Sequence, residues 1–271
     1  MPTWSIKSIL KGTAQRFGVK RALVAKVRMA AERHTLAAIM PSCKRERGRI
    51  LCYHSIGEPD WGVNNISPSL FRRQIEIALD SGYSFARARD IALTGGHKKE
   101  LAITFDDGHC SVLTQAAPIL NEYGIPFSLF VVSNWCENYT NWKPGAMMSW
   151  DQAGALADLG AEIGAHSATH PDFGQIDPSR FAAELEGSSR IIERRLGFAP
   201  DSFAIPLGQS ANWTEAAGQA AFSAGYRFVY AQAEDTRPKN TIPRTFVTAF
   251  DRDFIFRALL RGAFDNWEEW V

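Results

Sequence analysis

The sequence lacks several features that would assign it to a large functional class. It contains no run of about eighteen apolar residues, so no transmembrane helix is predicted. It also begins without the apolar stretch of a secretory signal peptide, which favours a cytoplasmic location. The four cysteines form no C-x-x-C pair and are predicted to be reduced thiols. No glycine-rich loop follows a predicted strand, which counts against a nucleotide-binding fold.

Acidic residues are scarce at the start of the chain. The 271 residues include 30 lysines and arginines against 29 aspartates and glutamates, but residues 1–50 hold twelve of the basic residues and only two of the acidic ones. The rest of the chain is therefore acidic on balance. With 45% hydrophobic and 22% charged residues, the composition suits one large globular α/β domain or two small ones.

Residues 1–35 are predicted to be helical and basic. Apolar residues recur at helical spacing over 4–17 and again over 19–30, and the lysines of the first segment lie off its apolar stripe. One interpretation is a peripheral amphipathic helix on an anionic membrane, which would place the protein at the inner membrane face. The other is a helical hairpin packed on the acidic remainder of the chain. No recognised nucleic-acid-binding module accompanies these charges, so a nucleic-acid partner is not expected.

From residue 49 onward, short apolar segments alternate with amphipathic ones. Strands are predicted near 50–53, 84–86, 101–105, 127–132, just before His166, and at 202–205, 226–230 and 244–247. Helices are predicted near 68–81, 88–93, 111–123, 150–159, 178–196 and 213–224, and from about 251. This alternation predicts parallel strands joined by right-handed crossovers, either in a barrel or in an open doubly wound sheet.

Two adjacent carboxylates follow the apolar strand 101–105. Asp106 and Asp107 stand where the strand ends, and two bare acids at this position need a cation or a proton to compensate them. A second strand runs into His166 and His170, and neutral imidazoles beside a carboxylate are a common ligand set for a zinc-like ion. The alternatives are a strand-end turn capped by the aspartates and two surface histidines.

These residues carry a resemblance to a known family. The segments 104–108 (TFDDG) and 166–170 (HSATH) resemble the first two motifs of the polysaccharide deacetylases, which include chitin, peptidoglycan and exopolysaccharide N-deacetylases with a NodB-homology domain. The likeness extends over about residues 48–250. It implies a distorted (β/α) barrel of about seven to eight strands, with a catalytic domain at 48–271 and a basic helical extension at 1–47.

The resemblance also implies roles for the matching residues. Asp107, His166 and His170 would hold one divalent metal ion, zinc in first place and otherwise cobalt, nickel or manganese. Asp106 would be the general base. The backbone N–H of Leu207 would stabilise the oxyanion. The residues assigned to the oxyanion and substrate side are Tyr53, Pro206, Leu207, Gly208 and Trp213.

The sequence departs from the family pattern at two places. The arginine that orients the catalytic aspartate in many members is replaced by Ala204, and no histidine follows His170 to serve as the usual late acid. His54, after the first strand, is the favoured replacement for this acid, and His109 is a weaker one. A strand-end cap is the alternative for His54. Arg244 is a candidate partner for one of the site carboxylates.

The sequence therefore predicts a metal-dependent hydrolase that removes N-acetyl groups from an amino sugar in a bacterial polysaccharide or glycan precursor. Two alternatives stay open: a carbohydrate-binding scaffold of the same fold that has lost catalysis, and a deacylase of a non-sugar amide. Loop tryptophans that could contact a sugar or pack in the core are Trp135, Trp142, Trp150 and Trp213. The oligomeric state is not predicted.

Overall fold

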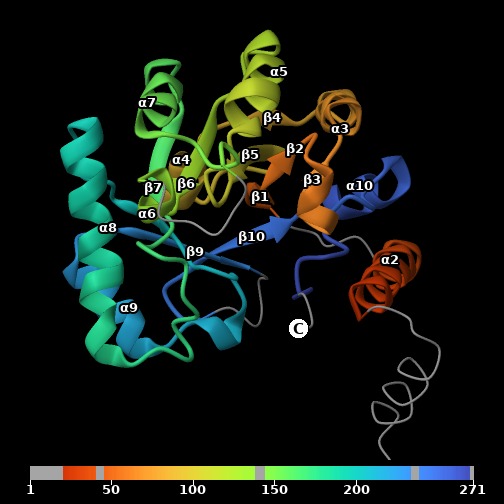
Figure 1. Ribbon diagram of the computed structural model, residues 1–271. Helices are drawn as coiled ribbons and strands as arrows, with labels where there is room; N and C mark the ends of the chain where they lie inside the picture. The colour runs from red at the N-terminus through yellow and green to blue at the C-terminus, as the bar shows by residue number, and fades with distance from the viewer. Residues whose placement is uncertain (1–20, 41–45, 138–143, 233–237, 269–271) are drawn as a thin grey trace, which may run out of the picture.

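A closed barrel of parallel strands forms the centre of the protein (Figure 1). The computed structural model describes residues 21–40, 46–137, 144–232 and 238–268. The strands of the barrel are β1 (Arg49–Tyr53), β5 (Glu100–Phe105), β6 (Phe127–Val131), β7 (Glu162–Ala165), β8 (Ser202–Ala204), β9 (Phe228–Gln232) and β10 (Ile242–Phe246). β1 pairs with both β10 and β5, which closes the ring of seven strands. The predicted distorted (β/α) barrel is confirmed.

Three further short strands lie outside this ring. β4 (Ser84–Phe85) pairs with the amino end of β5, next to the place where β6 pairs with its carboxyl half. β2 (Ser55–Ile56) and β3 (Asn65–Ile66) form a separate two-stranded ladder directly after β1. The ladder holds the loop that follows β1 over the carboxyl end of the barrel.

Side-chain alternation along the strands decides what faces the barrel interior. In β5, Leu101, Ile103 and Phe105 belong to the large core between the strands and the helices, whereas Ala102 belongs to the smaller cluster inside the barrel. Because successive strand side chains point to opposite faces, Thr104 and the following Asp106 share the inner face with Ala102. The same alternation puts Ile50 inside the barrel and Tyr53 outside it.

Helices cover the barrel, most of them on its outer side (Figure 1). They are α3 (Pro68–Asp80), α4 (Ala88–Thr94), α5 (Ala117–Glu122), α6 (Ser133–Cys136), α7 (Trp150–Asp158), α8 (Phe181–Leu196), α9 (Glu215–Ser223) and α10 (Asp253–Leu260). By contrast, α4 packs Ala88 and Ile91 against the cluster inside the barrel. Ser67 and Ser149 cap α3 and α7, as their positions in the sequence predict. The helix predicted over 111–123 is interrupted, because its first turn over 112–116 is a π-helix.

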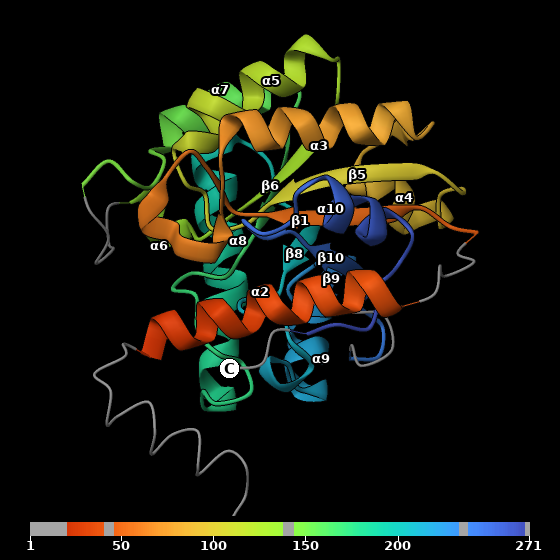
Figure 2. The same cartoon turned by 90° about the vertical axis from the view of Figure 1, so that its right-hand side faces the viewer.

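The helix α2 (Arg21–Ile39) lies against α10 and the segment that follows it (Figure 2). Arg33 points inward from α2 and is fully buried, with its Nε 2.9 Å from Oδ1 of Asp251. Its guanidinium also lies over the rings of Phe264 (3.7 Å) and Trp267 (4.9 Å). The described helix of the extension is therefore packed on the domain, while the apolar pattern predicted at 4–17, and with it the predicted hairpin, lies outside the described residues. Among the helices that the structure describes, none is long and apolar enough to span a bilayer.

Candidate active site

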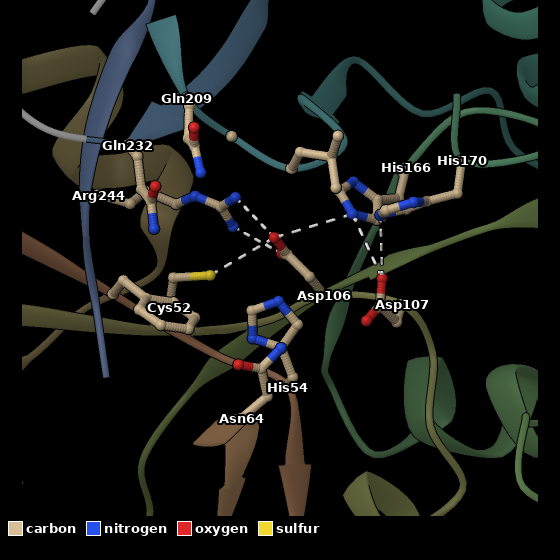
Figure 3. Close-up of a pocket in the computed structure, with 13 residues that line it drawn as sticks. Cys52, His54, Asn64, Asp106, Asp107, His166, His170, Gln209, Gln232 and Arg244 are labelled. Atoms are coloured by element: carbon tan, nitrogen blue, oxygen red, sulfur yellow. Dashed lines mark hydrogen bonds and ion pairs between the residues drawn. The ribbon is translucent and has the colours of Figure 1, made fainter. Parts of the chain in front are cut away.

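A pocket of about 200 Å³ opens at the carboxyl ends of the barrel strands (Figure 3). Side chains from the ends of β1, β5, β7, β8, β9 and β10 converge there because parallel strands present their carboxyl ends at one edge. The residues that line it are Cys52, His54, Asn64, Asp106, Asp107, His166, His170, Leu207, Gly208, Gln209, Gln232, Arg244 and Phe246.

Asp107, His166 and His170 form a compact group on one wall of the pocket. The Nε2 atoms of both imidazoles lie 3.5 Å from Oδ1 of Asp107. That oxygen is buried and has no hydrogen-bond donor. One potential ligand atom from each residue lies within 4.8 Å of the others. A buried carboxylate oxygen facing two imidazole nitrogens fits a divalent ion with nitrogen and oxygen ligands.

Surrounding groups hold the two histidines in place. Nδ1 of His166 lies 2.8 Å from the carbonyl oxygen of Ala204, and a proton on Nδ1 leaves Nε2 free to bind a metal. The loop that carries His170 is fastened to α8, because Glu184 accepts hydrogen bonds from the N–H and the hydroxyl of Thr169 at 2.9 and 2.7 Å. The histidine geometry is therefore set by neighbouring elements.

The backbone is strained around the pocket. In the described part of the chain, six non-glycine residues have positive φ, and four of them flank the site: Asp107 (73°), Ser167 (66°), His170 (62°) and Leu207 (65°). Such conformations cost of order 1–3 kcal/mol each, so the surrounding packing must over-determine them. Their concentration here indicates that the surrounding structure holds these side chains in place at a cost in local stability.

The two imidazoles differ in their electrostatics. Burial lowers the pKa of His170 to about 4, so this ring is neutral at neutral pH and can act as a ligand. Burial also works against protonation of His166, but the carboxylates of Asp106 and Asp107 overcome it and raise its pKa. A bound cation would take over the compensation of these carboxylates, and metal binding and protonation therefore compete at this site.

Asp106 is held on the other side of the pocket by Arg244. Nη1 and Nη2 of Arg244 donate to the two oxygens of Asp106 at 2.6 and 2.7 Å. Burial tends to raise the pKa of Asp106, but the charge and hydrogen bonds of Arg244, together with the nearby imidazoles of His166 and His54, more than offset it and hold the pKa well below its usual range. Asp106 is therefore an oriented, ionised carboxylate, and its Oδ2 also lies 4.0 Å from Nε2 of His166. Arg244 has the carboxylate partner that its sequence position suggested.

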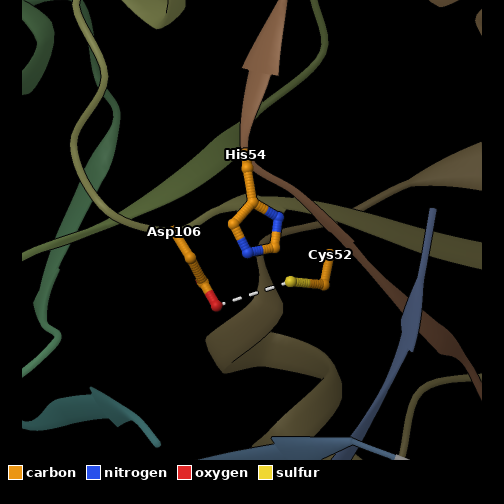
Figure 4. A group of neighbouring side chains, drawn as sticks. All are labelled: Cys52, His54 and Asp106. Carbon is orange, nitrogen blue, oxygen red and sulfur yellow. Dashed lines mark hydrogen bonds between the residues drawn. The ribbon is translucent and has the colours of Figure 1, made fainter. Parts of the chain in front are cut away.

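His54 and Cys52 stand beside Asp106 (Figure 4). The thiol of Cys52 donates to Oδ2 of Asp106 at 3.4 Å, and burial raises its pKa well above the usual value. The three residues are close enough to resemble a second ligand group. We regard this group as a poor metal site, because Arg244 occupies both oxygens of Asp106 and the thiol stays protonated.

The buried Nδ1 of His54 has no hydrogen-bond partner. Burial lowers its pKa, despite the nearby carboxylates. His54 thus enters the pocket, where its assigned role as the acid stays a prediction.

Three residues expected near substrate or catalysis are placed elsewhere. Tyr53 faces out of the barrel, where its hydroxyl donates to Oε1 of Gln74 at 3.1 Å and its ring packs on Phe71. Trp213 is 6% exposed and packs in the core. His109 is 1% exposed and its Nδ1 lies 2.8 Å from the hydroxyl of Ser111.

The remaining candidates divide in a similar way. Pro206 is buried and does not line the pocket, whereas Leu207 and Gly208 do. Trp135 stacks on His170 with ring centroids 5.4 Å apart. Trp150 is buried in α7, and Trp142 lies outside the described residues.

Several pocket residues carry no sequence signal of their own. Asn64 and Gln232 each present a buried side-chain oxygen without a donor, and Cys52, Gln209 and Phe246 complete the wall. The alternation rule could have found Cys52 and Phe246, since each shares the inner face of its strand. Asn64 ends the 3₁₀ helix Pro59–Asn64 and Gln209 lies in a loop, and at neither place does a sequence pattern indicate the direction of the side chain.

The sequence and the fold are both similar to those of known deacetylases. The family described as polysaccharide deacetylase matches residues 94–229, about half of the chain. The uncharacterized protein YlxY of Bacillus subtilis is 30% identical over 96 residues, which cover 35% of this chain and 27% of that protein.

Two solved structures share the fold. The deacetylase PplD of Streptococcus pyogenes has a TM-score of 0.67 at 21% identity, covering 79% of this chain and 97% of its own. The de-N-acetylase of Aggregatibacter actinomycetemcomitans has a TM-score of 0.68 at 21% identity, and the match covers 79% of this chain and 100% of that one. The family match spans both motifs that build the pocket, and the chain belongs to the polysaccharide deacetylase family.

Proposed function

We propose that the protein is a metal-dependent N-deacetylase that acts on an acetylated amino sugar of a glycan or glycan precursor. The observation that carries the proposal is the convergence of Asp107, His166 and His170 opposite the ionised Asp106 in one pocket. Membership of the polysaccharide deacetylase family supports an acetylated carbohydrate as the substrate. The identity of the metal is proposed as zinc, on the nitrogen and oxygen ligands present.

Asp107, His166 and His170 would hold the ion. A divalent ion held there would lower the pKa of bound water from 15.7 to about 7 and would polarise a carbonyl oxygen. Asp106 takes the proton of the attacking water, and Arg244 keeps this carboxylate ionised and aimed. The two neighbouring aspartates thus have separate tasks, because one is committed to the cation and the other to a proton.

His54 supplies a proton to the departing amine in this proposal. A histidine whose pKa is lowered by burial is a strong acid once it is protonated, which suits delivery to a poor leaving group. Leu207 and Gly208 form the wall where the carbonyl oxygen of the acetyl group would lie. The backbone N–H of Leu207 stabilises negative charge there.

The decisive experiment measures acetate release from N-acetylated oligosaccharides together with metal content. We expect Asp106→Asn to keep the metal and to lose about a hundred- to ten-thousand-fold in rate. Asp107→Ala should lose both the metal and the activity. The exposed Asp158→Asn should keep both.

Equal background rates for the wild type and Asp106→Asn would overturn the enzymatic proposal in favour of a carbohydrate-binding scaffold. A panel that includes N-acyl amides without a sugar tests the substrate class. Hydrolysis of those amides alone would overturn the assignment to amino sugars.

A further inference from the structure

Arg33 of α2 contacts the wall of the active site through the carbonyl oxygen of Phe246. Nη2 of Arg33 donates to this oxygen at 3.3 Å, and Phe246 lines the pocket at the carboxyl end of β10. The guanidinium also lies over the ring of Trp267, and that ring stacks on the ring of Phe246 with centroids 6.2 Å apart and an angle of 14° between the planes. Arg33 therefore fixes Phe246 at its backbone and, through Trp267, at its ring.

The ring of Phe246 also meets the imidazole of His54. The two centroids lie 5.4 Å apart with an angle of 84° between the planes, which is an edge-to-face contact. Among the described residues, the buried Nδ1 of His54 has no hydrogen-bond partner that could hold the ring. The orientation of this imidazole therefore depends on its packing against Phe246.

A second chain of contacts leads from Arg33 to the residue before His54. Asp251, the ion-pair partner of Arg33, accepts at its backbone oxygen from Nε2 of Gln74 at 2.8 Å. Oε1 of Gln74 accepts in turn from the hydroxyl of Tyr53 at 3.1 Å. Tyr53 is the last residue of β1 and directly precedes His54. This second route therefore fixes the backbone from which His54 projects.

The members of both routes are shielded from water. Arg33, Asp251 and Gln74 are fully buried, and Tyr53 and Phe246 are nearly so. A buried polar group that loses its partner bears the full cost of desolvation, so these hydrogen bonds are costly to break. Because the interior is close-packed, a displacement of Arg33 is passed on to its neighbours.

We propose that Arg33 is a positioning residue for the acid of the reaction, because it fixes the two neighbours that orient His54. The inference rests on the proposed deacetylase function, in which His54 gives its proton to the departing amine. When the C–N bond breaks, its electron pair goes to the nitrogen, which takes the proton from His54 and leaves the imidazole neutral. An imidazole turned away from the nitrogen cannot deliver this proton. The helix α2 thus contributes to catalysis, although none of its described residues lines the pocket.

Proton–carbon NMR spectra of the full chain test the positioning without any assay of activity. The imidazole C–H resonances of His54 sense the ring current of Phe246, because the two rings are in contact. Arg33→Lys keeps the buried charge, but lysine cannot form the two-bond fork to Asp251 and also reach Phe246. The substitution should shift the His54 resonances and leave those of the exposed His97 in place.

Two substrates with different leaving groups test the effect on the acid. An N-acetylated oligosaccharide releases an amine that needs a proton, whereas p-nitrophenyl acetate releases a phenolate that leaves without one. Arg33→Lys should lower kcat on the oligosaccharide about 10- to 100-fold, as expected for a misplaced catalytic group. It should lower kcat on the ester about twofold at most and leave KM for both substrates nearly unchanged, because only the transfer of the proton is affected.

Two further variants accompany Arg33→Lys. Arg28→Lys makes the same chemical change at an exposed position of α2 and should alter neither the spectra nor the rates. Tyr53→Phe removes one hydroxyl from the second route and leaves the ion pair intact, so it tests the inference even where Arg33→Lys does not fold. It should shift the His54 resonances and lower kcat on the oligosaccharide more than on the ester.

Three outcomes would count against the inference. Unchanged His54 resonances in Arg33→Lys and Tyr53→Phe would overturn it. Equal losses of kcat on the two substrates would overturn it as well, because Arg33 would then support the whole pocket and not the acid. A wild type that releases no acetate from either substrate would refute the deacetylase function and the catalytic part of the inference with it, whereas shifted His54 resonances would still establish that Arg33 positions this imidazole.

Discussion

Arg244 and Asp106, 138 residues apart, form a two-bond ion pair across the inside of the barrel. Their side chains are 2% and 5% exposed. Ala204 stands where many family members carry an orienting arginine, and Arg244 reaches the same carboxylate from β10. Arg244 thus makes the ion pair that the resemblance would have placed on an arginine at position 204.

Replacing Arg244 by lysine should slow the reaction without removing the charge. Lysine cannot form the two-bond fork, so the carboxylate of Asp106 would be less well aimed. Loss of a residue that orients a catalytic group typically costs about 10- to 100-fold, which acetate release at saturating substrate would measure. Arg244→Met should also destabilise the fold by about 3–5 kcal/mol, because Asp106 would remain buried without its partner.

The surface pair Arg89–Asp201 provides the control, with a distance of 2.7 Å and a half-exposed arginine. Arg89→Lys should leave both rate and stability within error of the wild type. A wild-type kcat for Arg244→Lys would show that Arg244 does not position the base.

Removing His170 should change how the metal-free protein responds to acid. The pKa of His170 is about 4 in the folded chain against 6.5 for the free side chain, so the unfolded state binds more protons between these values. The free energy of unfolding therefore decreases as pH falls from 6.5 to 4. His170 contributes about 3 kcal/mol at most to this decrease. Urea unfolding with a chelator present should show a shallower pH dependence for His170→Gln.

The exposed His97 serves as the comparison for this measurement. His97→Gln should unfold with the same pH dependence as the wild type. Identical slopes for His170→Gln and the wild type would mean that His170 titrates normally in the folded protein.

Local patterns predicted the parallel strands and the edge at which the site lies, and the family resemblance favoured a barrel over an open doubly wound sheet. Short apolar runs of three to six residues define the strands, and the residues after each run must meet at one edge. The motifs around Asp106 and His166 lie at such strand ends. Tyr53 also lies at a strand end, but the alternation of side chains turns it outward, and the prediction overlooked this rule.

Other features depend on tertiary contacts that no local pattern contains. Trp213 follows a strand as a sugar-binding aromatic would, yet it packs on Phe173, which belongs to a different loop. Arg33 lies in a basic segment and reads as a solvated charge, although Asp251 and two aromatic rings enclose it. In each case the partner is distant in the sequence, so the placement required the folded structure.

The ion pair of Arg33 and Asp251 should contribute strongly to the docking of α2. Both side chains are fully buried, and Asp251 also accepts hydrogen bonds from the N–H and hydroxyl of Thr248 at 2.9 Å each. Arg33→Met leaves a buried carboxylate without its cation and should lower the free energy of unfolding by about 3–5 kcal/mol. Urea denaturation measures this change.

A double-mutant cycle with Asp251→Asn separates the pair from its surroundings. The sum of the two single decreases in unfolding free energy should exceed the decrease in the double variant by more than about 1 kcal/mol. This difference is on the order expected for coupled buried charges. Arg28→Met, at an exposed position five residues earlier, should change stability by less than about 0.5 kcal/mol. Additive losses would show that Arg33 acts through its packing on the aromatic rings.

Gln232 should contribute to substrate binding. The residue is 7% exposed at the end of β9, and its side-chain oxygen is buried in the pocket without a donor. Its backbone N–H donates to the carbonyl oxygen of Gly208 at 2.7 Å. An unpartnered acceptor beside the wall formed by Leu207 and Gly208 is suited to a sugar hydroxyl or amide N–H. Gln232→Leu should therefore raise KM about three- to tenfold, the equivalent of one neutral hydrogen bond, and should change kcat less.

Initial rates over a range of substrate concentrations separate the two parameters for Gln232→Leu. Gln219→Leu makes the same chemical change at an exposed position of α9 and should leave both parameters unchanged. A decrease in kcat at constant KM would instead place Gln232 among the groups that act only in the transition state, because the loss would then appear after substrate is bound.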